Sequence, residues 1–163
     1  MGKENRIKAR EQAFFFCFGM EFSHSLDEVI EAYSEDEEPI GFAIELSRGC
    51  VEKTEECDEI IKRHLKKWKL SRIPKISRTL LRLSVYQLAF AKELTGGDNP
   101  TGVIINDAVR LAKEYATEED AAFINGVLGG VVRELEDKSS EEALDAQRET
   151  EDKVKIKAEG KDE

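Results

Sequence analysis

The sequence predicts an all-α protein, and three observations carry this prediction. Apolar residues recur at helical spacing along most of the chain, and the alternation typical of half-buried strands does not. Charged residues make up 37% of the chain and prolines number only three, a composition that favours helices. The 163 residues, 40% of them hydrophobic, fit one domain or one domain with a tail.

The first half of the chain is expected to form three helices. Residues 3–22 and 26–33 give the first two. An acidic run then ends at Pro39, which marks a break and the start of the next helix. Residues 40–68 keep apolar positions at helical spacing, so they are predicted to form one long helix.

The second half begins with a break at Pro74, followed by a predicted helix over residues 76–94. The stretch TGGDNP, residues 95–100, is a strong turn signal. Apolar spacing typical of a helix then resumes and continues as far as Tyr115.

The last predicted helix begins after Thr117, an N-cap residue with Asp120 in a capping-box-like position. It ends near Leu135. Residues 136–163 combine dense charge with few large apolar side chains, so we expect an acidic, disordered tail. The predicted domain therefore spans residues 1–135.

This last helix carries three glycines within the stretch AAFINGVLGGVVREL, and each costs about 1 kcal/mol relative to alanine. Gly126, Gly129 and Gly130 share a face that is nearly bare of bulk, opposite the apolar core face. Such a surface lets another backbone approach closely. The neighbour is either a helix of the same bundle or an extended ligand, with Phe123 at the border offering a ring.

The net charge of −10 conceals strong segregation of acidic and basic residues. Residues 60–92 contain ten lysines and arginines and no acid, and the first ten residues are also basic. A globally acidic protein can carry a local RNA-binding face, because phosphate affinity depends on the local field. The alternative is an ordinary solvated charged surface.

The first helix is apolar on all sides over more than one turn, through Phe14, Phe15, Phe16, Cys17 and Phe18. A surface helix of a small domain buries one face. The surplus therefore indicates either a helix wedged centrally in its own bundle or a second, intermolecular contact.

The sequence offers no sign of catalytic or metal chemistry. Three cysteines at irregular spacing make a poor disulfide framework, and there is no CxxC motif. We therefore expect buried, inert thiols, no catalytic residues, no metal and no cofactor. No window approaches a membrane span and no apolar leader is evident, so we expect a cytoplasmic protein that does not enter membranes.

Three segments resemble the NusB family. They are KAREQAFFFCFGMEF at residues 8–22, WKLSRIPKISRTLLRLSVYQL at 68–88 and VIINDAVRLAKEYATEEDAAFINGVL at 103–128. The resemblance covers about residues 3–135. It implies two small helical bundles packed across each other, about residues 1–72 and 73–135.

What the resemblance implies about function is a transcription antitermination factor that is not an enzyme. Such proteins bind the single-stranded boxA element of nascent RNA together with NusE, a small-subunit ribosomal protein. They act in the elongation complex with RNA polymerase and other Nus factors, notably in ribosomal RNA operons. The RNA contacts carried over by the resemblance are Lys3, Arg6, Lys8, Arg10, Glu119 and Phe123, and the NusE contacts are Phe18, Ser77 and Arg78.

The sequence departs from the family pattern at several of these positions. Many members have an acid where this chain has Ser77, and a Glu where it has Gln87. The departure at Ser77 questions one charged contact to NusE, while the apolar contact through Phe18 is retained. The basic arm, formed by Lys3, Arg6, Lys8 and Arg10, has lysines where some members have arginines. This departure would weaken boxA affinity without removing it.

Two other classes of protein share features with this sequence. RNA methyltransferases with a NusB-like domain are rejected, because this chain has no room for a cofactor-binding α/β domain. A homodimeric protein-interaction module with a masked or weak RNA site stays open, because the apolar first helix could serve a homodimer equally well.

Overall fold

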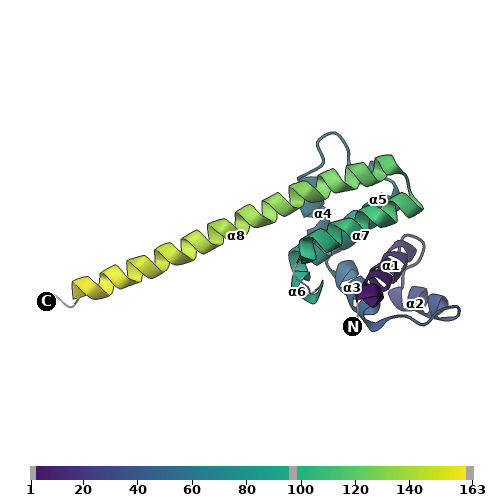
Figure 1. Cartoon of the computed structure of the whole chain (residues 1–163), viewed down its shortest axis with the longest axis horizontal. Helices are drawn as coiled ribbons and strands as arrows, with labels where there is room; N and C mark the ends of the chain where they lie inside the picture. Colours follow the sequence, from purple (N-terminus) through teal and green to yellow (C-terminus); the bar gives the residue numbers. More distant parts are fainter. Residues whose placement is uncertain (1–2, 96–98, 161–163) are drawn as a thin grey trace. The chain divides into compact units, whose positions relative to one another are not determined.

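The computed structural model describes residues 3–95 and 99–160. Within these ranges the regular structure is entirely helical, which confirms the predicted fold class. The helices are α1 (Lys3–Gly19), α2 (Leu26–Ser34), α3 (Gly41–Glu52), α4 (Thr54–Lys62), the 3₁₀ turn η1 (Leu70–Arg72), α5 (Lys75–Phe90), α6 (Lys92–Thr95), α7 (Pro100–Tyr115) and α8 (Glu118–Gly160) (Figure 1).

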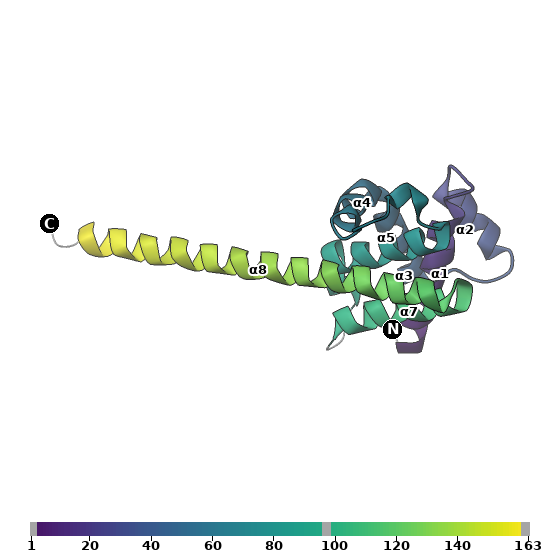
Figure 2. The ribbon, with the colours of Figure 1, turned by 90° about the horizontal axis from the view of Figure 1, so that it is seen from above.

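The chain divides into two units, one ending at Val131 and the other running from Val132. The first unit contains α1 to α7 and the start of α8. Its centre is α5, which packs against α3 and α4 and also against α1 and α7. Figure 2 shows α5 between α4 and α7.

Helix α1 is a central helix of the first unit. It packs mainly on α3, and the side chains of Phe14 and Phe16 are almost completely buried. Phe15 and Phe18 are half-buried. Most of the aromatic surplus in this helix is therefore explained by packing inside the domain.

An aromatic cluster joins α1 to the end of α7. The rings of Phe14 and Phe15 lie 5.7 and 5.4 Å from the ring of Tyr115, centroid to centroid. The Tyr115 hydroxyl donates a hydrogen bond to Oε1 of Glu11 at 2.7 Å. Burial, followed by this bond to Glu11, raises the pKa of Tyr115. Only two residues separate Tyr115 from the start of α8.

The prediction of one long helix over residues 40–68 is wrong. Helix α3 ends at Glu52 and α4 begins at Thr54, with Lys53 between them at φ −101° and ψ 18°. The Thr54 hydroxyl donates to the carbonyl oxygens of Cys50 and Val51. It therefore competes for these acceptors with the backbone amides of a continuing helix. The helix predicted to end at Leu94 is also interrupted, because α5 ends at Phe90.

Helix starts were predicted more accurately than helix ends. The Thr117 hydroxyl accepts a hydrogen bond from the Asp120 amide at 3.0 Å and donates to Oδ2 of Asp120 at 2.8 Å. The expected capping arrangement is therefore confirmed. At the start of α7, Oδ1 of Asn99 accepts a bond from the Gly102 amide, and Pro100 occupies the first turn.

Gly126 and Gly130 of α8 do not share one environment. A Cβ added at Gly130 would lie 2.8 Å from Nδ1 of His64, whereas a Cβ at Gly126 would meet nothing within 4 Å. The neighbour of Gly130 is thus an imidazole rather than a helix backbone. Gly126 faces open space, so no helix of the same bundle packs closely against it.

The second unit is helical where the sequence predicted disorder. Helix α8 continues to Gly160, and every side chain from 136 to 157 is exposed. No glycine or proline occurs between residues 131 and 159, and Ala, Glu, Lys, Gln and Arg favour helix. Helix propensity, rather than burial, accounts for this segment. The division of the domain at residues 72 and 73 stays a prediction.

Candidate nucleic-acid interface

Arg10 was expected to bind RNA, but the structure buries it. The residue is only 3% exposed, and its Nη1 donates to Oδ2 of Asp107 on α7 at 2.8 Å. Its Nε donates to Oε1 of Gln87 on α5 at 3.3 Å. Burial raises the pKa of Asp107 even though Arg10 opposes that shift. Arg10 therefore joins three helices and does not reach solvent.

Gln87, one of the positions that depart from the family pattern, belongs to this buried group. Its Nε2 donates to the Leu83 carbonyl oxygen at 3.2 Å, while its Oε1 accepts from Arg10. The residue is 3% exposed. A neutral amide supplies both a donor and an acceptor here, so Gln87 serves the core and does not meet a partner in this structure.

The other cations of α1 lie nearer the surface and are engaged by neighbours. Nη1 of Arg6 donates to the Leu94 carbonyl oxygen at 3.1 Å, and its guanidinium lies 5.3 Å from the centroid of the Phe42 ring. Lys8 is exposed and forms an ion pair with Glu37. Lys3 lies in the first turn of α1, and its side chain is outside the part of the chain that the structure describes.

Glu37 is shared between Lys8 and Tyr33. The Tyr33 hydroxyl donates to Oε2 of Glu37 at 2.7 Å. The hydrogen bond from Lys8, followed by that from Tyr33, lowers the pKa of Glu37. Burial, followed by the bond to Glu37, raises the pKa of Tyr33 to about 12. An acid therefore lies beside the exposed lysine of the basic arm.

Glu119 and Phe123 lie one turn apart at the start of α8 and line the same cavity. The cavity has a volume of about 380 Å³. Its walls are formed by Trp68, Arg72, Ile73, Pro74, Glu119, Asp120 and Phe123. Phe123 is half-buried and Glu119 exposed, so both can be reached by a ligand.

Trp68 and Arg72 were missed as site residues by sequence reasoning. Trp68 is 61% exposed, although it is the largest side chain of the chain. The signal that could have found it is a single tryptophan within the basic run 60–92, because an aromatic among cations is typical of nucleic-acid surfaces.

The three residues predicted to bind NusE differ in accessibility. Phe18 is half-buried against Phe14, with ring centroids 6.0 Å apart, and meets the edge of Phe22 at 5.3 Å. Ser77 is fully buried, and its Oγ has no hydrogen-bond partner among the described residues. A direct contact of Ser77 with a partner is therefore not possible in this conformation.

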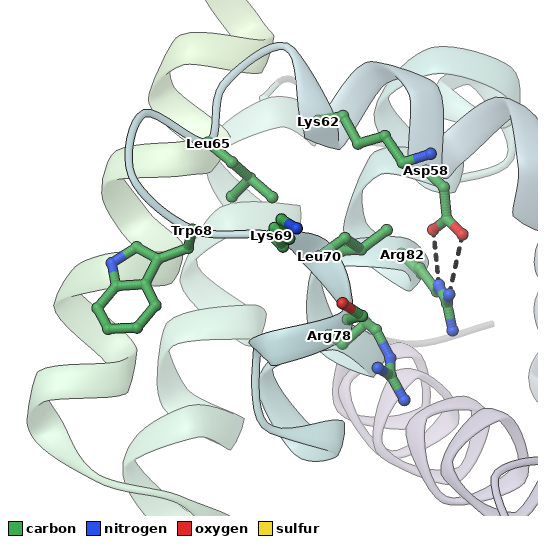
Figure 3. A pocket seen from close by; sticks show the side chains of 9 residues that line it. Asp58, Lys62, Leu65, Trp68, Lys69, Leu70, Arg78 and Arg82 are labelled. Atoms are coloured by element: carbon green, nitrogen blue, oxygen red, sulfur yellow. Dashed lines mark hydrogen bonds and ion pairs between the residues drawn. The ribbon is translucent and has the colours of Figure 1, made fainter.

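Arg78 belongs to a cluster of ion pairs that joins α4, α5 and the turn directly after α1. Its Nη2 donates to Oε2 of Glu21 at 2.9 Å. Arg82 donates to both carboxylate oxygens of Asp58 at 2.7 and 2.9 Å, as Figure 3 shows. These two arginines line a cavity of about 560 Å³ together with Asp58, Lys62, Leu65, Trp68, Lys69, Leu70 and Ser71.

Phe22 is a further exposed aromatic beside this cluster that the sequence did not single out. It is 68% exposed, it contacts Phe18, and Nζ of Lys75 lies 4.9 Å from its ring centroid. Glu21, which pairs with Arg78, directly precedes Phe22 in the chain, and Phe22 contacts Phe18. Phe22, Phe18 and the exposed Lys75 together form an apolar and basic surface suited to a protein partner.

The cysteines and acids of the described residues form no chemical site. All three thiols are free, and burial raises the pKa of Cys57. Among the residues described, no cluster of His, Cys, Asp and Glu could hold a metal ion. No helix in the same ranges is long and apolar enough to cross a membrane.

These features define a class: an all-helical domain that presents exposed aromatic and basic side chains around its cavities. The NusB family model matches residues 7–133. The chain therefore belongs to the NusB family of transcription antitermination factors, which are not enzymes.

The relatives support this assignment over most of the chain. The transcription antitermination protein NusB of Carboxydothermus hydrogenoformans is 38% identical over 143 residues, covering 82% of this chain and 96% of that protein. The structure of T. maritima NusB matches with a TM-score of 0.69 and 32% identity, covering 79% of this chain and 91% of that one.

A second solved structure contains partners. The antitermination factors NusB and NusE in complex with double-stranded RNA match with a TM-score of 0.67 and 29% identity. That match covers 81% of this chain and 98% of the matched chain. The NusB-like fold predicted from the sequence is confirmed by both structural matches.

Proposed function

We propose that this antitermination factor binds single-stranded boxA RNA together with NusE. The complex then helps RNA polymerase, with other Nus factors, to read through terminators in the cytoplasm, notably in ribosomal RNA operons. The observation that carries the proposal is the accessible pair Glu119 and Phe123 beside a cavity, at positions that the resemblance assigns to RNA.

The basic arm supplies the electrostatic part of the proposed RNA site. Lys8 is exposed, and Arg6 and Lys3 lie on the same helix nearer the N-terminus. Cations of this kind hold phosphates through counterion release. Arg10 is not among the proposed contacts, because its guanidinium is buried against Asp107. Its proposed role is to hold α1 against α5 and α7.

The proposed NusE surface is centred on Phe18 and Arg78, with Phe22 as an additional exposed anchor. Aromatic and arginine side chains are enriched at the centres of protein interfaces. Ser77 supports this surface from inside through its position in α5 and makes no contact with NusE. The solved complex of NusB with NusE supports the choice of partner.

The decisive experiment measures the binding of labelled boxA RNA to the full chain, with and without purified NusE, at several salt concentrations. We expect binding that is tightened by NusE and weakened by salt, and a scrambled RNA of equal length should bind more weakly. Equal affinity for boxA and the scrambled RNA in the presence of NusE would overturn the proposal.

The homodimeric alternative makes a different prediction. If the apolar side chains around Phe22 and Phe18 pair two copies, light scattering should give twice the monomer mass, and this mass should persist when NusE is added. A stable homodimer that excludes both NusE and boxA RNA would favour the alternative.

A further inference from the structure

We propose that Trp68 and Phe123 form the two aromatic walls of a pocket that receives one unpaired RNA base. This inference rests on the proposed function and deepens it. It adds Trp68 and Arg72, which neither the sequence motifs nor the resemblance assigned, to the RNA-binding residues. The juxtaposition that carries it is the cavity of about 380 Å³ between the segment 68–74 and the start of α8.

The size and rigidity of the cavity suit a small planar ligand. Ligand pockets in proteins have volumes of roughly 300–1,000 Å³, so this cavity lies at the lower end of the range. The segment that lines it is held in place, because Leu70 at the start of η1 and Ile73 directly after η1 are 9% and 5% exposed. Pro74 restricts the backbone where this segment enters α5.

Trp68 leaves most of its ring in solvent. In Figure 3 the indole extends away from Arg78 and Arg82 and toward the pale-green ribbon. It lines the cavity that contains Glu119 and Phe123. An indole that is 61% exposed forgoes much of the free energy that burial would supply. Aromatic rings in this setting are the usual stacking partners of unpaired bases.

The polar rim of the pocket selects a base over a phosphate. Two carboxylates, Glu119 and Asp120, lie at the cavity, and the Thr117 hydroxyl holds Oδ2 of Asp120. Carboxylates repel phosphates but accept hydrogen bonds from the amino and imino groups of bases. The guanidinium of Arg72, on the same rim, can pair with a neighbouring phosphate. The pocket therefore favours cytosine, adenine or guanine, which carry an exocyclic amino group, over uracil, whose single imino donor lies between two carbonyl oxygens that carboxylates repel.

The adjacent cavity beside Arg82 does not offer this combination. Its arginines are already paired, Arg78 with Glu21 and Arg82 with Asp58. Trp68 lines both cavities, but the second contains no other aromatic ring. The Trp68–Phe123 pocket is thus the place where stacking on two rings and recognition of a base edge coincide.

The experiment uses the intrinsic fluorescence of Trp68, which is the sole tryptophan of the chain. The full chain is first saturated with a tryptophan-free NusE variant, and boxA RNA is then titrated. We expect RNA to quench the indole emission. Trp68→Ala should weaken RNA binding by roughly 5- to 150-fold, the range that corresponds to about 1–3 kcal/mol per stacked base. Trp68→Phe should retain most of the affinity.

A control variant and modified RNAs make the test specific. Phe90→Ala removes another partly exposed ring, outside both cavities, and should leave RNA affinity unchanged. An abasic RNA should identify the stacked position, because at that position Trp68→Ala and the unmodified chain should bind equally. Replacing that base with uracil should weaken binding to the unmodified chain.

The outcomes separate this inference from the proposed function. If boxA RNA binds the NusE complex normally while Trp68 emission stays constant and Trp68→Ala retains full affinity, the pocket is wrong and the proposed function stands. If neither form of the chain binds boxA RNA, both are overturned. Quenching by RNA, with an abasic position that removes the effect of Trp68→Ala, supports the pocket.

Discussion

Near the starts of α1 and α8, residues of one type share a helical face but differ in their surroundings. In each, the sequence places like residues on one helical face: cations in α1, glycines in α8. In each, the structure divides the face. Arg10 is buried, whereas Arg6, one turn earlier, is half-buried and bonds the Leu94 carbonyl oxygen; Gly130 meets His64, whereas Gly126 faces open space. Helical spacing identifies the face, but the neighbouring elements decide what each position does.

The difference between the two helices lies in what burial requires. A buried guanidinium needs partners for its donors, and Arg10 has Asp107 and Gln87. A glycine against a ring needs only space, and Gly130 provides it for His64. The former is an electrostatic constraint and the latter a steric one, so the two faces should respond differently to substitution.

The largest effect is expected from Arg10→Ala, which leaves Asp107 buried without its cation. Loss of one member of a buried ion pair typically destabilises a protein by about 3–5 kcal/mol. Urea unfolding should therefore show a greatly reduced free energy of unfolding. Lys8→Ala, in the same helix, should change stability by no more than about 0.5 kcal/mol. If Arg10→Ala folds with unchanged stability yet loses RNA affinity, Arg10 is an RNA contact after all.

The two glycines of α8 should respond with opposite signs. Gly130→Leu would push against the His64 ring, and overpacking of this kind costs about 1–3 kcal/mol. Gly126→Ala meets open space and should stabilise the helix by up to about 1 kcal/mol. Thermal melts of both variants test this difference. Destabilisation by Gly126→Ala would mean that this position is covered.

A smaller effect is expected at the ion pair between Lys8 and Glu37. Lys8→Ala should lower boxA affinity and reduce the salt slope by roughly one unit, if the lysine contacts a phosphate. Glu37→Gln should do the opposite and raise RNA affinity modestly, because it removes an acid that competes for Lys8. An unchanged salt slope in Lys8→Ala would remove this residue from the RNA site.

The same Glu37→Gln variant has a spectroscopic readout in the absence of RNA. It should lower the pKa of Tyr33 from about 12 toward its ordinary value of 10, because one cause of the upward shift is lost. A raised pKa means that the neutral phenol stabilises the fold below pH 10, and that this contribution is lost as the pH rises toward 12. Difference absorbance of tyrosine during alkaline titration measures the change.

The smallest effect is expected from truncation after Glu136. The side chains beyond it that the structure describes are exposed through residue 157, so they contribute no buried apolar surface. The truncated chain should melt within a few degrees of the full chain and bind NusE equally well. A large loss of stability would show that the segment 137–163 packs on the domain.

Local signals in the sequence predicted much of the fold. The capping residues Thr117 and Asp120 and the turn before Pro100 have a direct chemical meaning, so the starts of α7 and α8 were found. The break at Lys53 has no glycine or proline to mark it. It depends on the hydroxyl of Thr54, whose bonding to backbone cannot be foreseen from spacing.

The candidate site was predictable only in part, for a similar reason. Phe123 lies at the edge of a helical face, which the spacing of α8 reveals. Trp68 reaches the same cavity from a segment distant in sequence, and no local pattern connects them. The burial of Arg10 likewise depends on Asp107, 97 residues further along the chain.

The contacts of Tyr115 connect α1 to the start of α8 through a short stretch of chain. Tyr115 is held by Glu11 and by the rings of Phe14 and Phe15, close to Phe18 on the same helix. Two residues later α8 begins and presents Glu119. Because the connection is so short, we expect a displacement of α1 at Phe18 to shift the first turn of α8. Occupation of either surface would then alter affinity at the other by the same factor, since thermodynamic coupling is reciprocal.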